Sequence, residues 1–202
     1  MRRLLSLIKK IAPFTAEEEN ALSSILRKKI LLPRERLGED ILPGSWMFVE
    51  EGFLLLIQRE KGRWACKNFY YEGVSTALYN VGSAELAENS FNVQAVEESV
   101  IYYLTSEDEE TMAEVFPRFF QARSILNTRS YMQHRKRAAL FTLDHELDRI
   151  IYVTKLFTIL FRAPERHLAE FLCVKKKMGR MILSNIYKKE RACKSMNKGR
   201  PD

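Results

Sequence analysis

The segment Trp46-Met-Phe-Val-Glu-Glu-Gly-Phe-Leu-Leu-Leu-Ile-Gln58 contains two short apolar runs joined by the turn signal Glu-Glu-Gly. Each run has the length and the aromatic or aliphatic content of a β-strand. Similar runs, separated by polar or glycine-containing turns, occupy residues 29–33, 64–71, 91–96 and 100–105. Several short strands at this spacing predict a sandwich, jelly roll or barrel.

Helical patterns flank this β-rich region. Before it, apolar stripes and an N-cap at Thr15 predict short helices over residues 2–12 and 16–29. After Leu104 no strand pattern recurs, and helices are expected over about 105–116, 118–137, 143–160, 164–172 and 175–187. The expected fold class is therefore α+β: an N-terminal β-roll or jelly roll with flanking helices, one long helix and a C-terminal helical element.

Charge divides the chain in the same way. Residues 1–116 carry 13 Lys and Arg against 19 Asp and Glu, whereas residues 117–202 carry 20 against 7, a net of +13. A strongly basic half is the natural place for a polyanion partner. We expect a β-roll domain over 1–117, a connecting helix over 118–140, a C-terminal domain over 141–190 and a disordered basic tail over 191–202.

Composition and motif content exclude several classes of protein. Among the 202 residues no apolar run approaches the roughly 20 residues that span a bilayer, and Lys9-Lys10 interrupts the N-terminal apolar stretch before any cleavage site. The chain lacks a nucleophile elbow, a P-loop and a clustered set of histidines, so no enzyme is expected. The three scattered cysteines, Cys66, Cys173 and Cys193, offer neither a disulfide framework nor metal-ligand spacing. We expect a cytoplasmic protein without a cofactor or metal.

Residues 164–187 have the pattern of a helix-turn-helix. Pro164 opens a first helix, Cys173-Val174 forms a short connection, and a second helix is expected to begin at Lys175. In this motif the N-terminal half of the second helix enters the major groove of DNA. Four apolar residues are expected to face the core: Met178, Met181, Ile182 and Ile186. Four basic residues are expected to contact DNA: Lys175, Lys176, Lys177 and Arg180, the last of which could pair with guanine. An ordinary helical hairpin with solvated lysines is the alternative.

This order of elements resembles the Crp/Fnr family of transcription regulators, in its Bacteroidetes-type version. Residues 46–53 resemble the family's strand and turn, residues 67–73 resemble the approach to its nucleotide-binding cassette, and residues 164–182 lie where the family has its helix-turn-helix. The resemblance implies a DNA-binding homodimer with a small-molecule effector. Its long helices would pair through Ile125, Met132 and Ala139, which lie one heptad apart.

The cassette itself departs from the family. Members that bind cyclic nucleotides hold the ribose with a glutamate and the cyclic phosphate with an arginine, but this chain has Thr76-Ala77 and Asn89-Ser90 at those places. Cyclic AMP is therefore not expected as the effector. The degenerate pocket implied by the resemblance comprises Gly73, Ser75, Thr76, Ala77, Asn89 and Ser90. Nearby aromatic residues are expected to fill it: Phe69, Tyr70, Tyr71, Tyr79 and Phe91.

The helix-turn-helix departs too. Cys173 stands where the family's turn usually has glycine, and Gly179 costs the second helix about 1 kcal/mol relative to alanine. No clear pair of strands for a wing follows Tyr187. These departures favour a second hypothesis, in which the chain is a sensor or adaptor that does not bind DNA and whose β-roll binds a small molecule or a protein.

Overall fold

The computed structural model describes residues 1–38, 41, 44–78, 90–156 and 158–197. The chain divides into two compact units: residues 1–64 with 68–134, and residues 65–67 with 135–202. Helix α4 (Arg118–Ala138) crosses the boundary between the units along the chain. Among the described residues the strands lie in the first unit, apart from residues 65–67 of one strand, and the rest of the second unit is helical, so the expected α+β fold class is confirmed.

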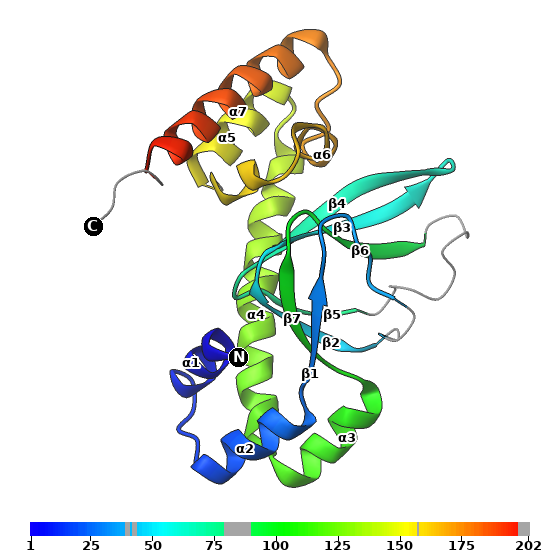
Figure 1. Ribbon diagram of the computed structural model, residues 1–202. Coiled ribbons are helices and arrows are strands. Elements are labelled where there is room, and N and C mark those ends of the chain that lie inside the picture. The colour runs from blue at the N-terminus through cyan, green and yellow to red at the C-terminus, as the bar shows by residue number, and fades with distance from the viewer. Residues whose placement is uncertain (39–40, 42–43, 79–89, 157, 198–202) are drawn as a thin grey trace. The chain divides into compact units, whose positions relative to one another are not determined.

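The first unit is built on two antiparallel β-sheets (Figure 1). One sheet has the order β1 (Arg27–Leu31), β7 (Ser99–Leu104), β2 (Trp46–Glu51) and β5 (Ser75–Ala77). The other has the order β4 (Arg63–Tyr71), β3 (Phe53–Glu60) and β6 (Phe91–Ala95). Every strand except β5 coincides, within about two residues at its ends, with an apolar run of the sequence, whereas β5 was not expected. The predicted β-roll is confirmed.

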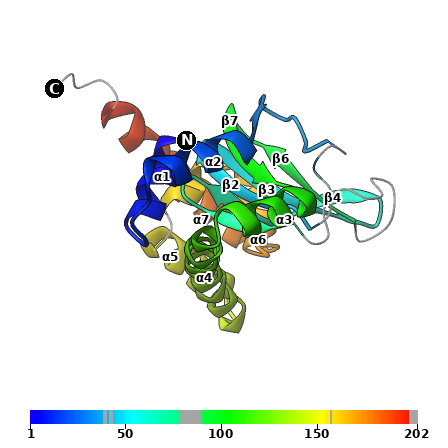
Figure 2. The same ribbon diagram turned by 90° about the horizontal axis from the view of Figure 1, so that it is seen from below.

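Strand β2 explains how the layers are held together, because both of its faces are buried. Met47 and Val49 belong to a core formed by residues of both sheets. Trp46 and Phe48 point to the opposite face, where they meet a second core. The helices that contribute to this second core are α1 (Arg2–Lys9), α2 (Ala16–Ile25), α3 (Ser106–Val115) and the first half of α4 (Figures 1 and 2). Alternate residues of one strand thus contact different layers.

Two features anchor β2 at its C-terminal end. Gly52 has φ +102°, and a Cβ there would lie 2.2 Å from the Ser99 hydroxyl oxygen, so the turn after β2 requires glycine. Glu50, which is 5% exposed, accepts hydrogen bonds from the backbone N–H groups of Arg3 (2.7 Å) and Leu4 (3.0 Å). Its carboxylate therefore binds the first turn of α1 to the sheet.

The second unit is helical. Its elements are η1 (Ala139–Thr142), α5 (Glu146–Leu156), η2 (Thr158–Arg162), α6 (Glu165–Phe171) and α7 (Lys177–Asn197). Buried side chains from all the α-helices of this unit form its core: Ile150, Val153, Phe161, Leu168, Phe171, Leu183 and Tyr187. The Tyr187 hydroxyl donates to the Ala163 carbonyl at 3.0 Å and closes this core. No described helix has both the length and the hydropathy needed to cross a bilayer.

Several predicted boundaries differ from the structure. Helix α7 begins at Lys177 rather than Lys175, and Glu146 accepts hydrogen bonds from the N–H groups of the two residues before it. It also continues to Asn197, so residues 191–197, expected to be disordered, are helical, whereas residues 198–202 lie outside the described part. The helix predicted over 143–160 is divided into α5 and η2. Among the described residues no strand follows Leu104, so none of them forms a wing.

Candidate functional site

Helix α7 presents a basic N-terminal end. Gly179, Leu183 and Tyr187 are buried at four-residue intervals and define the inner face of the helix. Lys177 and Arg180 are exposed within its first turn, and Lys175 and Lys176 are exposed just before it. The structure thus brings the four predicted basic residues together at one end of one helix.

The prediction that Met178 and Met181 face the core is wrong. Their side chains are 69% and 59% exposed, and Ile182 and Ile186 are only half-buried. The buried residue in the first turn of α7 is Gly179, and a pattern based on apolar side chains does not identify a glycine as a core position. The buried face of the helix therefore differs from the predicted one. Sequence reasoning therefore missed the outer face of α7, which carries Met178, Met181, Asn185 and Lys188, all exposed.

Glu146 at the start of α5 caps the segment that leads into α7. Its carboxylate accepts hydrogen bonds from the backbone N–H groups of Lys175 (2.8 Å) and Lys176 (3.1 Å). The Lys175 N–H, assisted by that of Lys176, lowers the pKa of Glu146 below its usual value. Gly179 makes room for this contact, since a Cβ at Gly179 would lie 2.5 Å from Glu146 Oε2. The glycine that weakens the helix therefore permits its cap.

A pocket of about 490 Å³ lies beside this cap. It is lined by residues 144–149 at the start of α5, by Lys176 just before α7, and by Met178, Gly179 and Ile182 in the first two turns of α7. Asp144 and Asp148 line the α5 side, so carboxylates and a lysine face the same space.

The turn between α6 and α7 contains a backbone conformation that favours glycine. Cys173 has φ +52°, in the left-handed region, and its side chain is exposed. Its N–H donates to the Glu170 carbonyl at 3.1 Å, and the Val174 N–H donates to the Ala169 carbonyl at 3.0 Å, which ends α6. Cys173 stands where the resemblance leads one to expect glycine, and its backbone adopts the conformation that glycine would favour.

In the first unit, the cassette region is fastened to α4. The Ser75 hydroxyl donates to Asn127 Oδ1 at 2.8 Å, and the Ser75 N–H donates to the Ser130 hydroxyl oxygen at 3.1 Å. The buried indole N–H of Trp46 donates to the same Asn127 oxygen at 3.1 Å. One asparagine of α4 thus joins strands β2 and β5.

The structure describes most of the other predicted pocket residues. Gly73 (φ +83°) precedes β5, Thr76 and Ala77 are half-buried on β5, and Ser90 is half-buried before β6. Asn89 and Tyr79 lie outside the described residues. The other predicted aromatic residues are buried or half-buried: Tyr70 belongs to the core between the sheets, Tyr71 and Phe91 pack against it, and the Phe69 ring lies 5.5 Å from that of Phe53.

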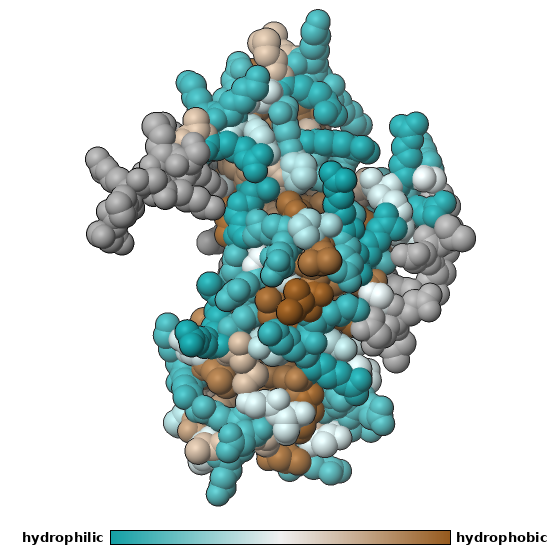
Figure 3. Space-filling view, in the orientation of Figure 1, coloured by the Kyte–Doolittle hydropathy of each residue, from teal (hydrophilic) through white to brown (hydrophobic). Residues whose placement is uncertain are grey.

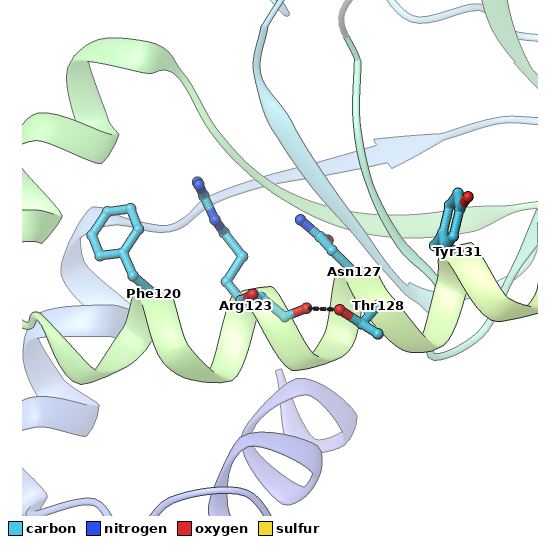
Figure 4. A pocket seen from close by; sticks show the side chains of 6 residues that line it. Phe120, Arg123, Asn127, Thr128 and Tyr131 are labelled. Atoms are coloured by element: carbon cyan, nitrogen blue, oxygen red, sulfur yellow. Dashed lines mark hydrogen bonds between the residues drawn. The ribbon is translucent and has the colours of Figure 1, made fainter.

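A groove of about 330 Å³ runs along α4 (Figure 4). Phe120, Arg123, Asn127, Thr128 and Tyr131 line it, with Ser124 between them. The Arg123 guanidinium lies 4.8 Å from the centre of the Phe120 ring and pairs with Glu109. The groove therefore combines aromatic walls with an amide and hydroxyl groups.

The predicted dimer residues are exposed. Ile125 and Met132 of α4 are 42% and 47% exposed, and Ala139 is exposed in η1, just beyond the end of α4. Two of the three thus lie on one helix, as the heptad spacing requires, whereas the third lies outside it.

No protein-family model matches this sequence, and no curated protein matches it. Its fold is nevertheless of the cyclic-nucleotide-binding type. A cyclic nucleotide-binding domain containing protein from Listeria monocytogenes is 12% identical, with a TM-score of 0.63 over 91% of this chain and 88% of that chain. The c-di-GMP responsive global regulator CLP of Xanthomonas campestris is 13% identical, with a TM-score of 0.58 over 88% of this chain and 92% of that chain. A CooA mutant from Carboxydothermus hydrogenoformans is 10% identical, with a TM-score of 0.57 over 90% of this chain and 83% of that chain.

Proposed function

We propose that this chain is a cytoplasmic transcription regulator of the Crp/Fnr type that binds DNA as a homodimer. The observation that carries the proposal is the cluster of exposed basic residues where α7 begins: Lys175, Lys176, Lys177 and Arg180. They lie at the N-terminal end of the second helix of a helix-turn-helix, the part that enters the major groove in this motif. The fold shared with a global regulator supports the same function.

The lysines act through phosphate contacts. Each phosphate that a lysine neutralises releases condensed counterions, so affinity falls as salt concentration rises. These contacts position the helix but carry no sequence information. Binding is therefore strongly salt-dependent, and removing the lysines weakens it on every sequence.

The test is duplex binding over a salt series with the Lys175→Ala/Lys176→Ala/Lys177→Ala variant. We expect this variant to lose affinity at low salt and to show a salt slope smaller by about 5 than that of the wild type, because each dimer loses six lysines and each contributes about 0.9. The control removes three exposed charges from the first unit (Arg2→Ala/Lys10→Ala/Lys28→Ala) and leaves the slope unchanged. If the wild type binds no duplex at low salt, or binds with no response to salt, the proposed function fails.

The homodimer forms through α4. Ile125 and Met132 leave an apolar strip exposed on that helix, and pairing with a second copy removes it from water. The Ile125→Asp/Met132→Asp variant should elute as a monomer in size-exclusion chromatography with light scattering, while Asn20→Asp, at an exposed position of α2, should stay dimeric. A wild-type monomer at micromolar concentration contradicts this part of the proposal.

The β-roll does not respond to cyclic AMP. Residues 73–95 include no Lys or Arg, so this part of the chain supplies no cation for a cyclic phosphate. The hydroxyl and N–H of Ser75 already donate hydrogen bonds to residues of α4. Thr76 and Ala77, the degenerate positions, lie on the same strand. Calorimetric titration with cyclic AMP should give no heat of binding, and micromolar affinity would overturn this statement.

One observation favours the adaptor alternative. The N–H groups of Lys175 and Lys176, which could otherwise bind a phosphate, are occupied by Glu146. In that alternative α7 has no nucleic-acid ligand, and the three-lysine variant behaves as the wild type in every duplex assay.

A further inference from the structure

The outer face of α7 carries more than positive charge. Met181 and Asn185 lie one helical turn apart at its exposed centre, and Met178 lies beside them. The C-terminal helices show a mostly hydrophilic surface with isolated apolar side chains on the face drawn in Figure 3. A 69% exposed Met178 and a 59% exposed Met181 on a helix otherwise rich in lysine match a ligand with both apolar and anionic groups.

The major groove of DNA provides such a ligand. The carboxamide of an asparagine can form two hydrogen bonds with adenine, through N6 and N7, and apolar side chains contact the thymine methyl group. Methionine suits the second task because its unbranched side chain adapts to an irregular surface. Guanine is read instead by paired donors from arginine or lysine.

Arg180 is less well placed to read bases than Asn185. Around the helix axis, Arg180 lies on the side of the buried Tyr187 and Leu183. Met181 and Asn185 lie on the opposite side, away from the buried face. Arg180 is therefore at the flank of the helix, where the phosphate backbone passes when the outer face enters the groove.

Resting on the proposed function, we infer that Asn185 and Met181 make this chain selective for A·T base pairs in the half-site. Asn185 binds an adenine, and Met181 contacts a thymine methyl group one or two base pairs away. Their separation of one helical turn, about 5–6 Å, fits that distance along the duplex. The flanking charges of Lys177 and Lys188 favour DNA over an apolar protein surface as the occupant.

The experiment is selection from a pool of duplexes randomised over both half-sites, carried out with the full chain. The wild type should enrich A·T pairs at two positions in each half-site. Asn185→Ala should lower the preference for adenine at one position by about 5- to 100-fold, and Met181→Ala should lower the preference for thymine over uracil, which lacks the methyl group, at another. Lys188→Ala should weaken binding without changing the selected sequence. Asn20→Ala, an exposed asparagine of α2, is the matched control and should leave both unchanged.

The outcomes separate the two proposals. A wild type that binds duplexes in a salt-dependent way but selects no A·T pairs, or an Asn185→Ala variant that selects the same sequence, overturns this inference and leaves the proposed function standing. A protein ligand on this face predicts that Met181→Ala leaves duplex affinity and preference unchanged. A wild type that binds no duplex overturns both proposals. Circular dichroism of the variants, all of which change exposed side chains, establishes that they are folded.

Discussion

The two units use their polar side chains in opposite ways. In the β-roll unit, Glu50 binds the first turn of α1, and Asn127 accepts hydrogen bonds from Trp46 and Ser75. In the helical unit, Asn185 and Lys188 are exposed on the outer face of α7. Polar groups that are partnered within the protein fix the geometry of the roll, whereas exposed ones are available to a ligand. The comparison supports the proposal that the second unit carries out recognition, while the partnered polar groups of the first make it rigid.

The largest effect is expected at the turn after β2. In Gly52→Ala the new methyl group overlaps Ser99 and the backbone is held at φ +102°, so the roll should lose about 2–5 kcal/mol of stability. Urea unfolding followed by tryptophan fluorescence measures this unit alone, because Trp46 and Trp64 both belong to it. Gly62→Ala is the control: it has φ +73° but nothing within 4 Å of its Cβ, so only about 1–2 kcal/mol should be lost. Equal losses would contradict the steric argument.

Breaking the contact between α4 and the sheet should have the next largest effect. Asn127→Ala leaves the buried Trp46 N–H and the Ser75 hydroxyl without their acceptor, and should lower the stability of the roll by about 1–3 kcal/mol. Thr128→Ala removes only a local hydrogen bond to the Ser124 carbonyl and should change stability little. The same fluorescence measurement checks both variants, and an unchanged midpoint for Asn127→Ala would show that the contact does not stabilise the roll.

The helical unit should respond in the opposite sense at its turn. Cys173→Gly relieves a left-handed backbone, and we expect a net gain of up to about 1 kcal/mol after the entropy of glycine in the unfolded chain is deducted. Hydrogen exchange at the amides of Leu183 and Tyr187 measures local stability there. Cys173→Ala keeps the unfavourable φ and should show no gain; a gain for alanine would mean that the thiol, not the backbone, is the cause.

The smallest effect concerns the cap before α7. The Glu146 pKa is lowered in the folded protein, so its contribution to stability is present above the pKa of the unfolded chain and is lost as pH falls through the folded pKa. The difference in thermal midpoint between the wild type and Glu146→Ala should therefore be present at neutral pH and should close below about pH 4. In Gly179→Ala the carboxylate is displaced, and NMR titration of Glu146 should give a higher pKa. An unchanged pKa would show that the close approach at Gly179 is not required.

All the described strands except β5 were predictable, because their residues alternate between two buried faces or form short apolar runs between turns. The three residues of β5 are too few and too polar to give such a signal. The capping boxes at Thr15 and Thr105 are also visible in the sequence, since each places an acidic residue three positions after the cap. The rotation of α7 was not predictable, because it depends on Glu146 lying against Gly179, a contact between residues 33 positions apart. The apolar pattern predicts that Met178 is buried and that Gly179 only weakens the helix. In the structure Met178 is exposed, and Gly179 is buried against Glu146.

The contact between Glu50 and α1 also bears on the order in which the protein folds. Helix α1 has eight residues, too few to persist alone in water. Its anchor lies on β2, which pairs with β7, a strand about 50 residues further along the chain. Helix α1 is therefore expected to become ordered only after β7, which is synthesised later, has paired with β2. A ribosome-bound fragment that ends before residue 99 should expose the apolar stripe of α1, and completion of β7 should bury it.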